Sequence, residues 1–276
     1  MRRLEGRVAV LTGAAAGIGR ALASRLADEG ATLCLADVNG EGLEETARAL
    51  ASRGASVSAH VVNVADEGQV GGLRRAVEER HGRADVLINN AGVALHGTVE
   101  EVSLADIEWV MSVNFWGTVY CVKHFLPMLR RRAGGRVVCM SSIFGVVAPP
   151  GQAAYCASKF AVRGFAEALR HELEGTGVRV STVHPGGVRT GIARSARIGA
   201  GANPSKGARE AERFERLAVT SPEAAAERIV RGMLRGEPRI LVGRDAAQID
   251  LVQRLLPARY WRLLRAAVER RAGPSE

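Results

Sequence analysis

The chain has 276 residues, of which 47% are hydrophobic, and we expect one α/β domain with a sizeable core spanning residues 1–276. Its net charge of +9 comes almost entirely from arginine, which is spread over nearly every predicted helix without a basic strip interleaved with aromatic residues, so we expect no specific nucleic-acid partner. No apolar run reaches the length of a membrane span, and clustered glycines after the first apolar stretch argue against a signal peptide.

Short apolar runs alternate with helical patterns along the chain. The runs fall at residues 7–12, 32–37, 56–62, 84–89, 135–141, 178–184 and 239–243, and the helical patterns end at residue 29 or span residues 41–53, 67–80, 104–132 and 153–175. The pattern at 104–132 is expected to break near Ser112. Continuous apolar strands separated by helices predict an α/β doubly wound (Rossmann) fold, with a seven-stranded, mostly parallel sheet and helices on both faces. Ligands are expected beyond the carboxyl ends of the strands.

Two segments lie outside this alternation. Residues 189–221, rich in Gly, Ala and Arg in their first half, predict a mobile substrate loop, with a tolerated insertion as the alternative. Residues 246–272 predict a C-terminal helical extension that is interrupted at Pro257. Three interpretations of this extension stay open: packing on the body or on a partner subunit, covering the substrate mouth, or peripheral contact with an anionic membrane as a basic amphipathic helix.

The stretch TGAAAGIGRA, residues 12–21, follows the first predicted strand and opens the first helix. Its glycines, Gly13, Gly17 and Gly19, stand where the backbone must turn tightly and approach a ligand closely. The helix N-terminus behind them offers unpaired N–H groups and the positive end of a dipole. The glycines, with Ala16 and Ile18 between them, therefore form a predicted pyrophosphate site.

Asp37 ends the second predicted strand. A carboxylate at this point can accept hydrogen bonds from both hydroxyls of an adenosine ribose and would repel a 2′-phosphate, which favours NAD as the cofactor. Arg20 and Arg25 are close in the sequence, so NADP stays possible. The alternative is that Asp37 caps the next helix.

The stretch AAYCASKFAV, residues 153–162, places Tyr155 and Lys159 four residues apart in a predicted helix, on one face. An ammonium beside a phenol favours the phenolate and lowers its pKa, so the pair predicts a general acid/base. The alternative is a half-buried tyrosine beside a snorkelling lysine. Ser142 follows the fifth strand, where its hydroxyl could hold a substrate oxygen, and Asn114 lies in VNFWG.

Together with NNAG at 89–92 and HPGGVRT at 184–190, these motifs resemble the short-chain dehydrogenase/reductase (SDR) family of the Tyr-x-x-x-Lys type. The resemblance is strong over about residues 5–190 and loose over 220–243. It implies an NAD(P)-dependent oxidoreductase that moves a hydride between nicotinamide and a secondary alcohol or ketone. It further implies that Tyr155 exchanges the proton, Lys159 lowers the tyrosine pKa and binds the nicotinamide ribose, and Ser142 polarises the carbonyl. Asn114 would hold a water that links Lys159 to solvent.

The resemblance also implies cofactor contacts outside the glycine-rich turn, and no metal. These contacts are Asn63 and Val64, where family members commonly carry Asp-Val, then Asn90, Ala91 and Gly92 on the adenosine side, and Pro185, Gly186, Val188 and Thr190 around the nicotinamide carboxamide. A homodimer or homotetramer built through the helices at 104–132 and 153–175 is implied as well.

The predicted substrate region is largely apolar, which favours a hydrophobic alcohol or carbonyl substrate over a sugar. Its residues are Val93, Leu95, Ile143, Phe144, Val146 and Val147, half of which could instead pack the core, and His96, expected at a loop surface. An NADPH-dependent 3-oxoacyl reductase acting on an acidic carrier is the alternative function, and a non-catalytic dinucleotide-binding protein is a more remote one. Four cysteines without a Cys-x-x-Cys pair predict buried thiols and a cytoplasmic location.

Overall fold

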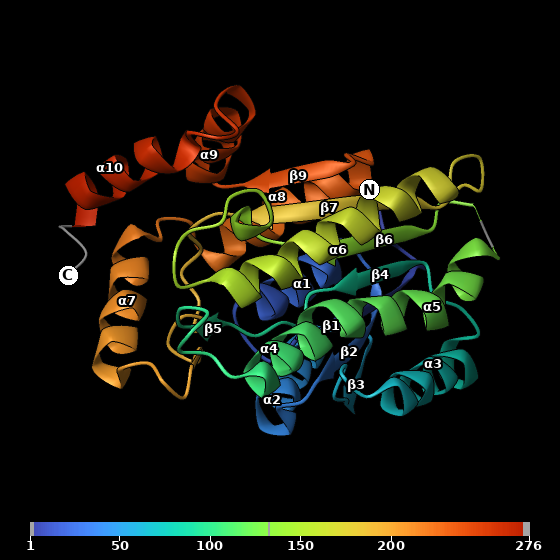
Figure 1. Ribbon diagram of the computed structural model, residues 1–276. Helices are drawn as coiled ribbons and strands as arrows, with labels where there is room; N and C mark the ends of the chain where they lie inside the picture. The colour runs from blue at the N-terminus through green and yellow to red at the C-terminus, as the bar shows by residue number, and fades with distance from the viewer. Residues whose placement is uncertain (1–2, 132, 273–276) are drawn as a thin grey trace.

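Seven parallel strands form the central sheet of the computed structural model, which describes residues 3–131 and 133–272 (Figure 1). In spatial order they are β3 (Val57–Val61), β2 (Thr32–Asp37), β1 (Val8–Thr12), β4 (Val86–Asn89), β6 (Arg136–Met140), β7 (Arg179–Pro185) and β9 (Arg239–Val242). The order reverses between β1 and β4, and such a switch point opens a crevice at the carboxyl edge of the sheet. The predicted doubly wound fold is confirmed.

Helices cover both faces of this sheet. In chain order they are α1 (Gly17–Asp28), α2 (Gly40–Ala51), α3 (Glu67–His81), α4 (Leu104–Met111), the π-helical turn η1 (Ser112–Trp116), α5 (Gly117–Arg130), the 3₁₀ turn η2 (Ile143–Gly145), α6 (Ala153–Glu172), α7 (Pro204–Leu217), α8 (Pro222–Arg235), α9 (Arg244–Leu255) and α10 (Tyr260–Ala272). Among these described helices, none combines the length and apolar character needed to cross a membrane.

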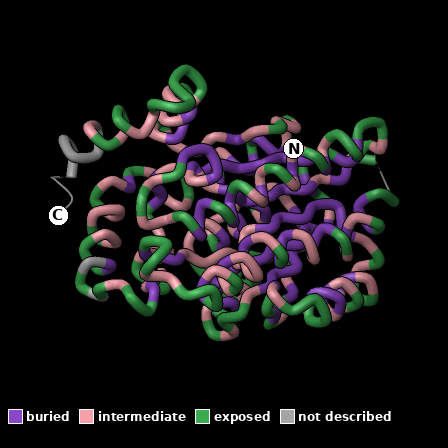
Figure 2. Tube along the Cα trace, in the orientation of Figure 1, coloured by how far each residue is buried: buried purple, intermediate pink, exposed green. Residues whose placement is uncertain are grey.

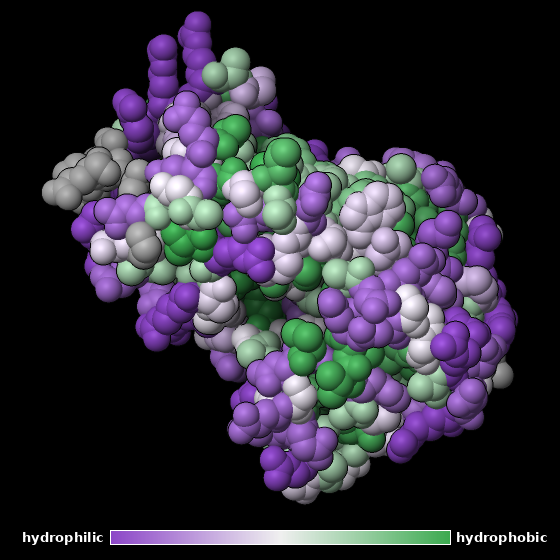
Figure 3. Space-filling model, turned by 60° about the horizontal axis from the view of Figure 1, so that its bottom comes forward, coloured by the Kyte–Doolittle hydropathy of each residue, from purple (hydrophilic) through white to green (hydrophobic). Residues whose placement is uncertain are grey.

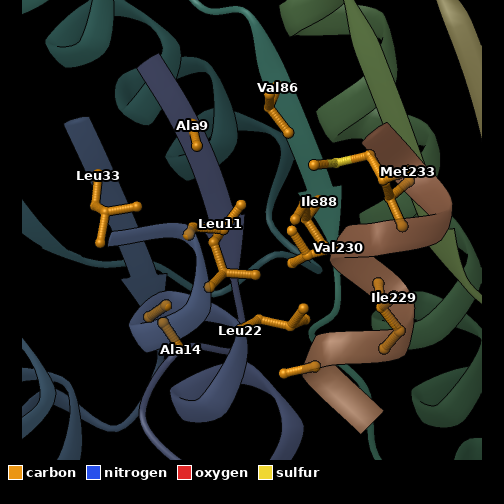
Figure 4. Close-up of a cluster of buried hydrophobic side chains, with 14 of the residues drawn as sticks. Ala9, Leu11, Ala14, Leu22, Leu33, Val86, Ile88, Ile229, Val230 and Met233 are labelled. Atoms are coloured by element: carbon orange, nitrogen blue, oxygen red, sulfur yellow. The ribbon is translucent and has the colours of Figure 1, made fainter. Parts of the chain in front are cut away.

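Side-chain alternation along the strands builds one core on each face. Leu11 and Leu33 point to the core that α1, α2 and α8 close, shown in Figure 4, whereas Val10 and Cys34 point to the core under α3, α5 and α6. Because both faces are buried, the strands are apolar at nearly every position. Buried residues follow the sheet in Figure 2, while α9 and α10 are largely exposed.

The segment 189–221 contains regular secondary structure. Its first half carries β8 (Arg197–Ile198), which pairs with β5 (Leu95–His96), and its second half forms α7. The Arg197 guanidinium lies 3.7 Å from the centre of the Trp109 ring and bonds Asp106 at 3.2 Å, so this strand is tied to α4. Asn203 begins α7 by accepting a hydrogen bond from the Ser205 N–H (2.9 Å). The Asn-Pro pair at 203–204 is the start signal that a search for periodicity alone overlooks.

Candidate active site

The glycine-rich turn between β1 and α1 is packed so closely that larger residues would not fit. Gly13 has a φ of +69°, and a Cβ atom there would lie 2.7 Å from Ala91 Cα. A Cβ atom on Gly19 would lie 1.8 Å from the Gly13 carbonyl oxygen. A Cβ atom on Gly17 would lie 3.2 Å from Thr190 Cγ2, so the structure brings Thr190 beside the turn.

The N-terminus of α1 has no side-chain cap, because its N-cap is Ala16, and its first turn carries no acidic residue. Among the described helices, α2, α3, α4 and α8 are capped by the side chains of Asn39, Asp66, Ser103 and Ser221, whereas α5, α6 and α9 also begin without a side-chain cap. The first N–H groups of a helix need partners from outside the helix, and an anion is a suitable one. This turn therefore fits the pyrophosphate of a dinucleotide.

Asp37 lies beside the glycine-rich turn and does not cap α2. Its carboxylate accepts hydrogen bonds from the backbone N–H groups of Ala15 and Asn39, both at 2.9 Å. The cap of α2 is Asn39, which accepts from Gly42 N–H at 3.2 Å. Arg20 donates to the Ala15 carbonyl at 2.8 Å and pairs with Glu45 at 3.0 Å, so its charge is already partnered next to the turn.

Asn90 braces the glycine-rich turn from the end of β4. Its Nδ2 donates to the carbonyl oxygens of Thr12 (3.0 Å) and Gly13 (2.9 Å). The Thr12 hydroxyl in turn accepts from the backbone N–H groups of Asn90 and Ala91, both at 3.1 Å. Thr12 was not among the predicted site residues, although a hydroxyl residue directly before Gly13 was a usable signal.

The two residues after β3 differ in environment. Asn63 is exposed, and its side-chain oxygen accepts from the Ala65 N–H at 3.1 Å, which forms a local turn. Val64 is buried and packs so closely on α5 that a Cβ atom on Gly117 would lie 2.8 Å from it. The side chain of Asn63 is thus exposed just after the carboxyl end of β3, while that of Val64 is part of the core under α5.

Tyr155, Lys159 and Ser142 meet at the carboxyl edge of the sheet. Tyr155 and Lys159 lie on the buried face of α6, with Lys159 Nζ 5.7 Å from the centre of the phenol ring. Lys159 Nζ also donates to the Met140 carbonyl at 3.2 Å. Ser142 follows β6, and its Oγ accepts from the Phe144 N–H at 3.1 Å.

Burial determines the protonation of this pair. It raises the pKa of Tyr155 to about 12, although the Ser142 hydroxyl hydrogen bond acts in the opposite direction. It lowers the pKa of Lys159 to about 8. Among the groups of the chain itself, Lys159 therefore does not lower the Tyr155 pKa as expected. Burial destabilises the phenolate by more than the neighbouring groups stabilise it.

Asn114 lies in the π-helical turn η1, a widened turn of the kind often found at functional sites. Its Oδ1 accepts from the Val93 N–H (2.8 Å), and its Nδ2 donates to the Val93 carbonyl (3.0 Å) and to Ser158 Oγ (2.9 Å). A Cβ atom on Gly92 would lie 3.1 Å from Asn114 Oδ1 and 3.2 Å from Lys159 Nζ. Asn114 and Lys159 therefore converge on Gly92, and Ser158 is a further member that the sequence analysis missed.

The end of β7 and the residues after it are held by the first turn of α9. Pro185 and Val188 are buried, and the Gly187 N–H donates to an Asp245 carboxylate oxygen at 2.6 Å. A Cβ atom on Gly186 would lie 2.2 Å from that same oxygen. Nothing in the sequence connects Asp245 with these residues, because they are 58 positions apart.

His184 supports Ser142 from β7. The His184 side chain is fully buried, and its Nδ1 donates to the Ser142 carbonyl at 3.1 Å. Burial lowers the pKa of His184 to about 4, against the hydrogen bond to Ser142, which raises it. The ring is therefore neutral near pH 7.

The titration of His184 predicts how stability depends on pH. An unfolded histidine has a pKa of about 6.5, so below that value only the unfolded chain binds the proton, and the free energy of unfolding falls as the pH drops toward 4, by on the order of 3 kcal/mol. His184→Asn can still donate to the Ser142 carbonyl but cannot titrate, and we expect it to lose this part of the pH dependence. Urea unfolding of both proteins from neutral to mildly acidic pH measures the difference. Equal slopes for the two would contradict the assignment, since His60 and His81, whose pKa values are also lowered, are common to both.

Apolar side chains surround the catalytic edge. Leu95 packs with Tyr155, and Phe144 links that cluster to Ile143, Val146 and Val147. Leu95, Ile143, Val146 and Val147 are buried in the core, in line with the alternative that half of the predicted substrate residues pack there. Val93 and Phe144 are only partly buried. His96 is half-buried beside Gln152 (3.1 Å). Figure 3 shows hydrophobic side chains around a hollow beside the lobe that carries the C-terminus.

One cavity lies apart from this edge, and no metal site is found among the described residues. A cavity of about 370 Å³ beside Arg170 and Arg179 lies at the amino ends of β7 and β9, away from Tyr155. In the part of the chain that the structure describes, no group of three His, Cys, Asp or Glu side chains is placed to hold a metal ion.

Comparison with known proteins gives a consistent result. Residues 7–200 match the family model described as short chain dehydrogenase. The oxidoreductase SadH of Mycobacterium tuberculosis is 43% identical over 270 residues, 97% of each chain, and D-threitol dehydrogenase of Mycolicibacterium smegmatis is 39% identical over 70% of this chain and 75% of that one. The crystal structure of an SDR from Burkholderia phymatum in complex with NAD superposes with a TM-score of 0.86 at 31% identity, covering 93% of this chain and 96% of that one. The chain therefore belongs to the short-chain dehydrogenase/reductase family of oxidoreductases.

Proposed function

We propose that this protein is an NAD(P)-dependent dehydrogenase that interconverts a secondary alcohol and a ketone. The observation that carries the proposal is the meeting of Tyr155, Lys159 and Ser142 at the sheet edge beside the uncapped end of α1. A bound nicotinamide would supply the hydride chemistry, and the chain would supply position and proton transfer.

Each of these side chains has a role that its surroundings support. Tyr155 is held as a neutral phenol by burial, so it is ready to donate a proton to a carbonyl oxygen as that oxygen gains negative charge. His184 donates a hydrogen bond to the Ser142 carbonyl and so fixes the Ser142 backbone. The Ser142 hydroxyl can then donate to the same substrate oxygen. Lys159 would stabilise the resulting phenolate, and Asn114 would place a water next to Lys159 near Gly92 to return the proton from solvent.

We infer a preference for NAD over NADP. The Asp37 carboxylate is oriented by Ala15 and Asn39 beside the turn where an adenosine ribose would lie. Arg20, a basic group beside this turn, is already paired with Glu45.

The substrate is inferred to be apolar, because Val93, Phe144 and the clusters around them border the catalytic edge. The alternative of a 3-oxoacyl reductase that uses NADPH is disfavoured by Asp37. We also infer a homodimer or homotetramer: Trp116 and Phe160, on the two helical segments expected to join subunits, are 46% and 40% exposed. The four cysteines are buried free thiols, which supports a reducing compartment such as the cytoplasm.

Cofactor binding tests the proposal directly. The purified protein is titrated with NADH and, separately, with NADPH, and nicotinamide fluorescence is followed. We expect NADH to bind at least about tenfold more tightly, a difference of about 1.4 kcal/mol, and a panel of ketones to be reduced with NADH. Tighter binding of NADPH would favour the 3-oxoacyl reductase, and binding without turnover of any alcohol or ketone would favour the non-catalytic alternative.

A further inference from the structure

The C-terminal extension returns toward the catalytic edge. After α9 the chain turns at Leu256, whose carbonyl accepts from the N–H groups of Arg259 (3.0 Å) and Tyr260 (2.8 Å). The helix α10 then runs to α7, and the two helices contact each other at the end of the sheet that carries the active site (Figure 1). A segment outside the Rossmann core is thus placed beside the substrate region.

One face of α10 is packed against the loop that carries Ser142. The Tyr260 hydroxyl accepts a hydrogen bond from the Ala148 N–H at 3.1 Å. Tyr260 and Leu264, which are four residues apart and so on one face of α10, join the apolar cluster that includes Ile143 and Val147. The neighbouring Leu263 is 50% exposed. The membrane interpretation requires the apolar side chains of α10 to lie on the surface. Because Tyr260 and Leu264 pack inward, they are not available for such a contact.

Phe144 connects this face to the chemistry. It packs in one cluster with Tyr260 and Leu264 and in another with Tyr155. Its ring meets the Tyr155 ring edge to face, with centroids 6.2 Å apart. Phe144 therefore belongs both to the cluster that contains Tyr260 and Leu264 and to the cluster that contains the proposed proton donor.

From this placement we propose that α10 forms the outer wall of the substrate cleft, and that Tyr260 and Leu264 limit the length of the substrate's aliphatic part. The inference rests on the proposed function and makes its substrate class specific: a ketone or secondary alcohol with an extended hydrocarbon body that runs past Phe144 toward α10. Tyr260 and Leu264 are specificity-determining residues in this proposal and take no part in the proton transfer.

Shortening Leu264 should lengthen the accepted substrate. We expect Leu264→Ala to move the maximum of kcat/KM toward longer methyl ketones in a series that differs by single methylenes. Past the wild-type maximum, each methylene that enters the new space raises kcat/KM by about fourfold. The matched control is Leu263→Ala, the same change one position away on the exposed face, which should keep the wild-type profile.

Three readouts separate the possible results. NADH affinity equal to that of the wild type shows that each variant keeps its dinucleotide site, and Leu264→Met, which nearly conserves volume, should retain the wild-type profile. If Leu264→Ala keeps the wild-type chain-length profile and has normal NADH affinity, α10 does not limit substrate length. The proposed function would be unaffected by this result. If the wild type reduces no member of the series and oxidises none of the matching alcohols, both the proposed function and this inference fail.

Discussion

Replacing Tyr155 with phenylalanine is expected to lower kcat for ketone reduction by about a thousandfold, within the range of about 10²–10⁴ that a positioned general acid contributes. The substitution removes only the hydroxyl. The ring keeps its place in the cluster with Phe144 and Leu95, so the fold and the dinucleotide site should be preserved. Steady-state kinetics with NADH and the best ketone of the panel, together with an NADH titration, measure the two effects separately.

Tyr120→Phe is the matched control for this experiment. Tyr120 is a half-buried tyrosine on α5 whose ring stacks on Trp116 at 5.9 Å, on the helical surface expected to join subunits. The same loss of a hydroxyl there should leave kcat within about twofold of the wild-type value, as expected for a residue outside the acid–base machinery. Normal turnover by Tyr155→Phe would remove Tyr155 as the proton donor and with it the proposed mechanism.

Neutralising Asp37 is expected to weaken the preference for NADH over NADPH by about thirtyfold. A unit charge pair at about 4 Å in water is worth about 1 kcal/mol, so a carboxylate facing a dianionic 2′-phosphate opposes binding by about 2 kcal/mol. Asp37→Asn removes this repulsion while its side-chain oxygen can still accept from the Ala15 N–H. The preference should weaken mainly because NADPH binds more tightly, and the same fluorescence titration measures this affinity.

Asp28→Asn serves as the control for charge alone. Asp28 ends α1 at the opposite edge of the sheet, where it pairs with Arg53. The variant has the same change in net charge but should keep the wild-type ratio of NADH to NADPH affinity. An unaltered ratio in Asp37→Asn would show that another group, such as Arg20 released from Glu45, selects the cofactor.

Local patterns predicted the framework of this protein well. Seven apolar runs became the seven strands of the sheet, and Tyr155 and Lys159 share a buried face of α6, as a spacing of four residues in a helix requires. Periodicity was less informative for 189–221, where an Asn-Pro start signal produces α7 and two short strands pair across the chain. Pairing of β5 with β8 depends on residues about a hundred positions apart, which no local pattern reports.

The sequence by itself determined the doubly wound fold and the glycine-rich turn, and it placed Tyr155 and Lys159 on one helix face, because each depends on residue types at short fixed spacings. The proposed catalytic set as a whole, with Ser142 and Asn114, came from the resemblance to the SDR family. Tertiary structure alone decided which groups support that set: Thr12 under Asn90, Ser158 beside Asn114, His184 behind Ser142 and Asp245 against Gly187. It also decided that burial raises the Tyr155 pKa and that α10 lies next to Phe144. These features arise from desolvation and from contacts between distant segments, and both exist only once the chain has folded.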